Sequence, residues 1–308
     1  DYLAVAFADE GVMLRKSGIY IPILVMNPEK NDFYLITEYN LEPELYNQRI
    51  LDDFKDYLYR SGIRNYPVHI KIDTGMHRLG FSASEIPDLV QKISEKYFKV
   101  VSVFSHLAAA DEKKHDKFTR KQISDFTAIT EKLKALTGIN FLRHILNSPG
   151  IERFSEASFD MVRLGIGMYG ISSTDQSALK QVSTFKTKVS QIRELEEGET
   201  VGYGRAGVID TTSGIATLPV GYGDGLPRSL SNGVGKFVLN HHLVPVIGSV
   251  CMDMCMVDIT GIEANEGDEV EIFGNEQPVS IIARAAGTIP YEILTGISGR
   301  VKRIYYQE

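Results

Sequence analysis

The stretch HIKIDTGMHRLGF, residues 69–81, joins an apolar strand pattern to charged residues that could do chemistry. The apolar run reaches Lys71 and then breaks into a segment that contains Asp73, Met76 and Arg78. A folded interior tolerates such charges only where they are paired or face a polar cavity. The pattern therefore predicts that this strand ends at a functional site.

Other apolar runs of the first half also end in polar residues. Because the carboxyl ends of parallel strands meet at one edge of a sheet, these residues are expected to lie together. The runs are residues 68–72, 100–105, 142–146 and 160–164, which carry or lead into Lys71, His106, His144, Asn147, Ser148 and Arg163.

The elements that must position these residues alternate between strands and helices, which implies a parallel sheet. Polar groups at several strand ends, with no Gly-x-Gly-x-x-Gly loop after an early strand, favour a (β/α)8 TIM-type barrel over an open doubly wound sheet. Only seven of the eight strands are found. The expected strands are 2–7, 21–26, 33–37, 68–72, 100–105, 142–146 and 160–164, and the expected helices are 9–17, 43–61, 84–97 and 116–136.

The pattern of expected helices and strands changes near residue 175. Short strand patterns separated by Gly-rich turns follow, and helical patterns are nearly absent until residues 279–294. We therefore expect a (β/α) barrel over residues 1–175 and a mostly-β domain over residues 176–308.

Composition excludes several classes of protein. The 308 residues are 43% hydrophobic and 24% charged, with a net charge of −7, which does not suit a nucleic-acid surface. No apolar run is long enough to span a bilayer. Cys251 and Cys255 are expected to be reduced thiols of a cytoplasmic protein, and no further ligands near them predict a metal site.

Eight segments of the chain resemble the alanine racemase family, in that family's order and with its spacing. Any one of them alone would be a weak signal, but together they cover nearly the whole chain. The segments are KIDTGMHRLGF, FSHLAAAD, NSPGIERF, FDMVRLGIGMYGI, VGYGR, PVGYGDGLPR, SVCMDMCMVDIT and IPYEILTGISGRVKRIYY.

The resemblance implies a pyridoxal-phosphate (PLP) enzyme, a homodimer that interconverts L- and D-alanine for peptidoglycan synthesis. The segments DYLAVAFADEG and VKRIYYQE resemble the racemase half of a bacterial fusion, which implies a peptidoglycan-precursor ligase upstream. In the family, the first barrel strand carries the lysine that forms a Schiff base with PLP, in a Val-Lys-Ala-x-Ala-Tyr-Gly pattern. That pattern is absent here, and Asp1 begins what resembles the second strand.

Catalytic roles carry over onto Tyr203, His144 and Arg78, of which Arg78 matches an arginine near the PLP phenolic oxygen and the substrate carboxylate. Tyr203 matches the base on one face of the substrate, supplied by the partner subunit, while the lysine serves the other face. A phenol with a pKa of ~10 needs a polarising neighbour to act as a base at neutral pH. The resemblance assigns this to His144, which in turn contacts Arg163, the residue that donates to the pyridine nitrogen of PLP.

The remaining matches concern cofactor and substrate. His106 matches the residue that lies against the PLP ring, and Lys71 matches a lysine that is carbamylated in many family members. The phosphate cup matches Asn147, Ser148, Gly165, Ile166 and Tyr291, and the substrate contacts match Met76, Arg78, Met252 and, at the entrance, Tyr222.

Plainer interpretations of single residues stay open at this point. Tyr203 is also consistent with a strand tyrosine packed on its domain, Arg163 with a partner of Asp160, and Lys71 with a partner of Asp73. Two further functions also stay open: a PLP-binding piece that does not catalyse, and a racemase acting on serine or on several amino acids.

Overall fold

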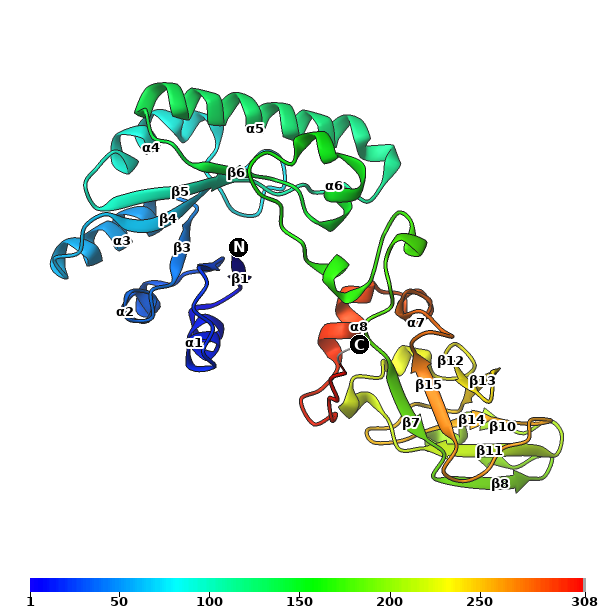
Figure 1. The fold of residues 1–308 in the computed structure, drawn as a ribbon. Coiled ribbons are helices and arrows are strands. Elements are labelled where there is room, and N and C mark those ends of the chain that lie inside the picture. Colours follow the sequence, from blue (N-terminus) through cyan, green and yellow to red (C-terminus); the bar gives the residue numbers. More distant parts are fainter. Residues whose placement is uncertain (307–308) are drawn as a thin grey trace. The chain divides into compact units, whose positions relative to one another are not determined.

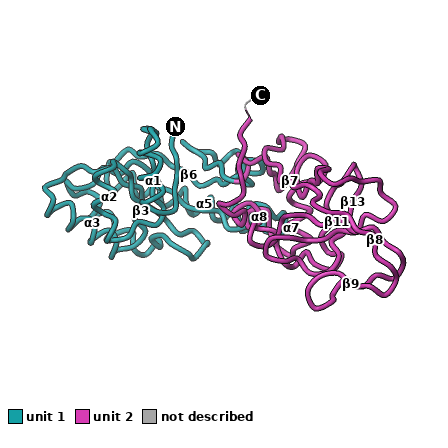
Figure 2. The backbone as a smooth tube through the Cα atoms, turned by 90° about the horizontal axis from the view of Figure 1, so that it is seen from below, with its two compact units in different colours: residues 1–165 teal, residues 166–308 magenta. Residues whose placement is uncertain are grey.

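The computed structural model describes residues 1–306, which fall into two compact units (Figure 2). The first unit is Asp1–Gly165, and the second begins at Ile166. The first is built on a parallel sheet and the second on antiparallel strands, so the expected fold class of a barrel-type unit followed by a mostly-β unit is confirmed.

The first unit contains six parallel strands whose order in the sheet is their order in the chain (Figure 1). Each strand is hydrogen-bonded to the next strand along the chain, and a helix or loop connects the two, as expected for a barrel-type βα fold. Within residues 1–306, no strand joins the two outer strands of this curled sheet, so it is open there. The strands are β1 (Leu3–Val5), β2 (Ile23–Val25), β3 (Glu42–Leu45), β4 (Tyr66–Lys71), β5 (Phe98–Phe104) and β6 (Leu142–His144).

The helices of this unit bury one apolar face each against the sheet. One core contains Ile70 together with side chains from three different helices, which are Leu51 and Phe54 from the first, Leu89 from the second and Phe126 from the third. Burying each such side chain contributes roughly 1.5–3 kcal/mol. The helices are α1 (Ala8–Lys16), α2 (Phe33–Glu38), α3 (Gln48–Arg60), α4 (Ile86–Ile93), α5 (Asp116–Thr137) and α6 (Ser148–Arg153), with α4 and α5 side by side over β5 and β6 (Figure 1).

Two predicted elements between residues 33 and 61 are wrong. The expected strand 33–37 is helix α2, whose buried Phe33 and Ile36 have helical spacing. A short apolar run does not distinguish a strand from a helix. The expected helix 43–61 begins only at Gln48, where the Asn47 side chain caps it by accepting a hydrogen bond from the Ile50 N–H at 2.9 Å. The residues before that cap form β3 instead.

The predicted strand 160–164 is also not a strand. Its backbone lies beside the β6 segment and donates two hydrogen bonds to it, from Asp160 to the Arg143 carbonyl at 3.1 Å and from Arg163 to the Leu146 carbonyl at 3.0 Å. This irregular segment nevertheless brings Arg163 to the carboxyl end of the sheet.

The second unit is a seven-stranded antiparallel sheet with two helices and a small two-stranded ribbon, β9 (Thr200–Val201) with β10 (Gly207–Val208). The order of the large sheet is β7-β15-β12-β13-β14-β11-β8. Its strands are β7 (Phe185–Lys188), β8 (Gln191–Leu195), β11 (Ser213–Leu218), β12 (Lys236–Leu239), β13 (His242–Ile247), β14 (Cys255–Asp258) and β15 (Glu269–Phe273), and the helices are α7 (Val279–Ala286) and α8 (Pro290–Gly296).

Two expectations drawn from the composition concern the cysteines and membrane-spanning segments. Cys255 opens β14 and Cys251 lies in the loop before it, and both thiols are free. None of the helices in the described part of the chain is both long and apolar enough to cross a bilayer.

The loop between Asp73 and Gly80 returns to the strand it leaves, and Gly80 makes this possible. Gly80 has φ +129°, and a Cβ there would lie 2.5 Å from the Asp73 backbone nitrogen. Gly80→Ala is therefore expected to lower the free energy of unfolding by about 2–3 kcal/mol in urea denaturation. Gly138→Ala is the matched control, because Gly138 has φ +68° but open space around it, and should cost only about 1 kcal/mol. Equal losses would contradict this account of the loop.

Candidate active site

Polar side chains gather on one face of the parallel sheet, toward its carboxyl end. Alternation along each strand sends apolar residues such as Ile70 to the helices and their neighbours to the opposite face. The strand register sets Glu44 beside His69, His69 beside Ser102, and Lys71 beside Phe104. All of these polar residues are buried, at 4% exposure or less.

A chain of hydrogen bonds crosses this face from β3 to Arg163. Arg163 can only donate, so its Nη1, 2.7 Å from His144 Nδ1, fixes that nitrogen as an acceptor. The proton of His144 is then on Nε2, which donates to Ser102 Oγ at 2.9 Å, and Ser102 donates to His69 Nδ1 at 2.6 Å. His69 Nε2 finally donates to the Glu42 carboxylate at 2.8 Å. The donor role of Arg163 thus fixes the tautomers of both His144 and His69.

Arg163 is held by contacts on both arms of its guanidinium group. Besides His144, it donates to the Ser105 carbonyl at 2.7 Å and the Ile145 carbonyl at 3.2 Å, and its Nη2 lies 3.2 Å from His106 Nδ1. Burial lowers the pKa of Arg163 to about 10, which leaves it cationic at neutral pH. The alternative partner Asp160 pairs with Arg143 instead, at 3.5 Å.

Both histidines next to Arg163 are neutral at physiological pH. Burial, followed by the charges of Arg163 and Lys71, lowers the pKa of His106 to about 3. Burial and the Arg163 charge also lower the pKa of His144 well below its ordinary value. Neutral imidazoles accept hydrogen bonds, so they keep the guanidinium group in one orientation.

Lys71 and Glu44 form a buried pair at the ends of β4 and β3. Lys71 Nζ lies 3.7 Å from Glu44 Oε1 and 4.4 Å from the centre of the Phe104 ring. Burial raises the pKa of Glu44 and lowers that of Lys71, while the charge of each partner opposes the shift. The alternative partner Asp73 is engaged elsewhere, since its carboxylate accepts from the Gly75 and His77 backbone N–H groups.

The loop after β4 carries two of the predicted substrate contacts. It is closed by backbone bonds from Phe81 to the Lys71 carbonyl and from Asp73 to the Phe81 carbonyl. Met76 is half-buried in this loop and Arg78 is exposed. The charge of Arg78 reaches the buried face, because it contributes to lowering the pKa of Glu44. The loop therefore adds a second arginine near the Lys71 end of the sheet.

Three residues of the predicted phosphate cup lie together after β6. Asn147 caps α6 by accepting a hydrogen bond from the Gly150 N–H at 3.1 Å, and Ser148 is the first residue of that helix. The Gly165 N–H donates to Ser148 Oγ at 3.0 Å. The other two predicted cup residues belong to the second unit: Ile166 is buried in its core, and Tyr291 is 47% exposed at the start of α8.

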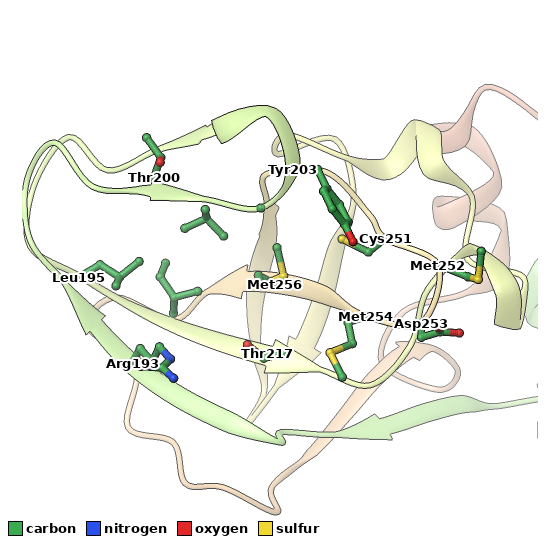
Figure 3. Close-up of a pocket in the computed structure, with 13 residues that line it drawn as sticks. Arg193, Leu195, Thr200, Tyr203, Thr217, Cys251, Met252, Asp253, Met254 and Met256 are labelled. Atoms are coloured by element: carbon green, nitrogen blue, oxygen red, sulfur yellow. The ribbon is translucent and has the colours of Figure 1, made fainter.

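In the second unit, Tyr203 lies in a tight turn, Tyr203–Arg205, and not in a strand. It is 77% exposed, so the interpretation as a packed strand tyrosine is wrong. Tyr203 and Met252 both line a cavity of about 710 Å³ whose walls are rich in methionine (Figure 3). The other lining residues are Arg193, Leu195, Thr200, Val201, Gly202, Ile215, Thr217, Cys251, Asp253, Met254 and Met256.

The segments of Tyr222 and Met252 run against each other. Tyr222 donates its backbone N–H to the Cys251 carbonyl at 3.0 Å, and Gly223 donates to the Met252 carbonyl at 2.8 Å. Arg300 joins the two segments by ion pairs to Asp224 and Asp253, each at 2.8 Å. The second unit therefore presents its three predicted site residues, Tyr203, Tyr222 and Met252, on connected loops.

Sequence reasoning missed Glu42, Glu44 and Ser102. The segment LEPELYN was interpreted as the start of a helix, although Asn47 is a strong capping residue and would have placed the helix start at Gln48. The carboxylates at positions 42 and 44 would then have shared one face of a strand. No sequence signal distinguishes Ser102 from an ordinary strand serine.

The architecture and these side chains define a class of protein. A curled parallel sheet with polar side chains at its carboxyl end, followed by a mostly-β domain, agrees with the barrel and β-domain that the resemblance to a PLP-dependent family implies. The chain matches the family descriptions "Alanine racemase, N-terminal domain" over residues 1–173 and "Alanine racemase, C-terminal domain" over residues 182–305. The chain belongs to the alanine racemase family, which is PLP-dependent.

Individual relatives agree with this assignment. A curated alanine racemase of Thermodesulfovibrio yellowstonii is 38% identical over 314 residues, covering 100% of this chain and 83% of the relative. The crystal structure of alanine racemase from Streptomyces lavendulae superimposes with a TM-score of 0.93 at 29% identity, covering 100% of this chain and 84% of that one. An alanine racemase structure from Clostridium difficile gives a TM-score of 0.91 at 32% identity, with coverages of 99% and 82%. The comparisons give no support for a fused ligase.

Proposed function

We propose that this protein is an alanine racemase that interconverts L- and D-alanine with PLP as its cofactor. The observation that carries the proposal is Arg163, a cationic guanidinium group fixed by His144, His106 and the Ser105 carbonyl at the carboxyl end of the sheet. The family's assignment of this arginine to the pyridine nitrogen requires such a fixed donor. The names of the relatives favour alanine over serine as the substrate.

The residues present fit PLP. Asn147, Ser148 and Gly165 supply an amide, a hydroxyl and a backbone N–H within one small region, which suits a phosphate group. We assign the rest of the phosphate cup to Ile166 and Tyr291. The half-buried imidazole of His106 would lie against the ring. When bound, PLP supplies the electron sink that makes the α-proton of an amino acid acidic.

Arg163 would hold the pyridine nitrogen as a hydrogen-bond donor without giving it a proton. With its pKa lowered only to about 10, Arg163 keeps its own protons at neutral pH. The neutral His144 and His106 accept from it and so preserve its charge. The electron sink is therefore weaker than one with a protonated ring, which suits a reaction that must return the proton promptly.

Tyr203 would move the proton on one face of the substrate α-carbon, and we propose that it acts in the site of a partner subunit. Its 77% exposure leaves the phenol free to enter a second molecule. His144 is a poor candidate for its polarising neighbour, because the His144 side chain is fully buried and both ring nitrogens are already bonded. His106 is the better candidate, since it is half-buried and contacts Arg163 through Nδ1 only.

The substrate carboxylate would be bound from both sides of this interface. Arg78 and the Met76 backbone belong to the loop after β4, and Met252 belongs to the loop that lines the Tyr203 cavity. Tyr222, on the segment bonded to that loop, would form part of the entrance. We infer that the protein is a homodimer with two shared sites. We also infer that it is located in the cytoplasm and that its product serves peptidoglycan synthesis.

The test is an isotope-exchange assay on the full-length protein. With PLP in D2O, either isomer of alanine should racemise and acquire deuterium at the α-carbon, and serine should react about tenfold or more slowly. PLP binding without exchange into alanine would contradict the proposal and favour a non-catalytic PLP-binding protein. Faster exchange into serine would favour the broader racemase.

A further inference from the structure

Glu44 is a buried carboxylate with no place in the reaction as proposed above. It is 0% exposed, and neither of its oxygens accepts a hydrogen bond from any residue between 1 and 306. A buried carboxylate without hydrogen bonds is costly unless cations compensate for the lost water. The carboxylate must therefore be balanced by charge.

The charges of three cations in the first unit act on Glu44. Lys71 on β4 lies 3.7 Å away, and the charges of Lys71, Arg163 and Arg78 each lower the pKa of Glu44 against the effect of burial. Lys71 and Arg163 also share contacts with one aromatic ring, at 4.4 Å and 5.3 Å from the centre of Phe104. Glu44 is the negative charge that these cations have in common.

Burial lowers the pKa of Lys71, but its contacts oppose this effect and favour the ammonium form. A cation gains from the face of Phe104 and from the Glu44 carboxylate, whereas a neutral amine gains little from either. Carbamylation needs the neutral amine, which attacks CO2 to give an N-carboxylate and release one proton. In this site the product would be a second anion beside Glu44, and the contact of the ammonium ion with Phe104 would be lost.

We propose that Glu44 supplies the fixed negative charge at this position, so that Lys71 remains an unmodified ammonium ion. Glu44 is then a positioning residue, which orders Lys71. The role in substrate binding rests on the proposed racemase function, but the chemical state of Lys71 can be measured without any activity.

The first experiment records 13C NMR spectra of the protein equilibrated with 13C-bicarbonate. Wild type should give no carbamate resonance beyond that of a Lys71→Met variant. Glu44→Gln keeps the size of the side chain but removes its charge, so the pKa of Lys71 falls, the amine is freed, and a carbamate resonance should appear. Glu42→Gln is the matched control, because Glu42 lies on the same face of β3 but bonds to His69 instead of Lys71.

The second experiment adds bicarbonate to the racemase assay. Glu44→Gln should lose roughly tenfold or more in kcat/KM for alanine, the scale of a lost charge-assisted contact, and bicarbonate should restore part of it by creating the missing anion on Lys71. Whatever activity Glu42→Gln retains should not respond to bicarbonate. A merely structural role of Glu44 would show no such rescue.

Two results would overturn the proposal. One is a carbamate resonance in wild type that disappears in Lys71→Met. The other is a folded Glu44→Gln variant, verified by circular dichroism, with neither a carbamate resonance nor a bicarbonate-dependent rate. Both readings of the NMR experiment stand even where no racemase activity is found, so failure of this inference is distinct from failure of the proposed function.

Discussion

Replacing Tyr203 by phenylalanine is expected to lower kcat/KM for racemisation by about 10²–10⁴-fold, the usual contribution of an acid–base group. The change removes one hydroxyl from a residue that is 77% exposed on its turn, so folding should not be affected. L- and D-alanine have equal free energies, which obliges both directions of racemisation to fall by the same factor. Exchange of the α-proton with solvent from the opposite face should survive, because the base of that face is untouched.

The measurement compares racemisation with deuterium incorporation in D2O for each isomer of alanine. Exchange that persists with retention of configuration, while racemisation is lost, identifies Tyr203 as the one-face base. Tyr305→Phe is a suitable control, because Tyr305 is an 87% exposed tyrosine of the same unit outside the Tyr203 cavity. Racemisation near the wild-type rate in Tyr203→Phe would refute the assignment.

The second large effect concerns the stability of the Lys71–Glu44 pair. Removing one member of a buried ion pair typically costs about 3–5 kcal/mol, while replacing both members by well-packed hydrophobic residues of similar volume is often neutral or stabilises by about 1–4 kcal/mol. Lys71→Met should therefore destabilise the protein strongly at pH 8, and Lys71→Met combined with Glu44→Met, which replaces both charges by apolar side chains of similar size, should recover the loss. Urea denaturation of the two variants and wild type measures both free energies. A double variant as unstable as Lys71→Met would contradict the pairing.

The pH dependence of Lys71→Met follows from the raised pKa of Glu44. A carboxyl group whose pKa is higher in the folded than in the unfolded state stabilises the fold fully at a pH below its unfolded-state pKa. This stabilisation is lost as the pH rises through the folded-state pKa. Burial raises the pKa of Glu44, and Lys71 opposes the rise, so without Lys71 the pKa is higher still. The deficit of Lys71→Met against wild type should therefore shrink as the pH falls from 8 toward the ordinary carboxyl pKa of ~4.

A buried ion pair adds little net stability, and sequence alone shows only half of the Lys71–Glu44 pair. The abrupt change from an apolar strand to Lys71 and Arg78 predicts a site at the end of residues 68–72, because buried charges need a reason. Glu44 escapes notice because its segment contains a proline and two glutamates, which resemble the first turn of a helix. Only the register of β3 against β4 places that carboxylate beside Lys71.

The order of helices and strands was predictable in most of the chain. Long amphipathic segments such as α5 have enough periodic positions to define their type, whereas the five residues 33–37 do not. The path of Arg163 was not predictable, because it depends on two backbone bonds to the β6 segment from residues outside any regular strand. The other proposed site residues of the first unit nevertheless follow β4, β5 and β6, three strands that the sequence patterns do locate.

The proposed sharing of each site between two subunits is tested most directly by mixing two inactive variants of the full-length protein, Arg163→Ala in the barrel unit and Tyr203→Phe in the second unit. After subunit exchange, half of the dimers carry one of each chain, and each of these has one site with both defects and one with neither. The mixture should therefore recover about a quarter of the wild-type activity. A mixture with demonstrated heterodimers but no activity above either parent would place Tyr203 in its own subunit's site and contradict the shared arrangement.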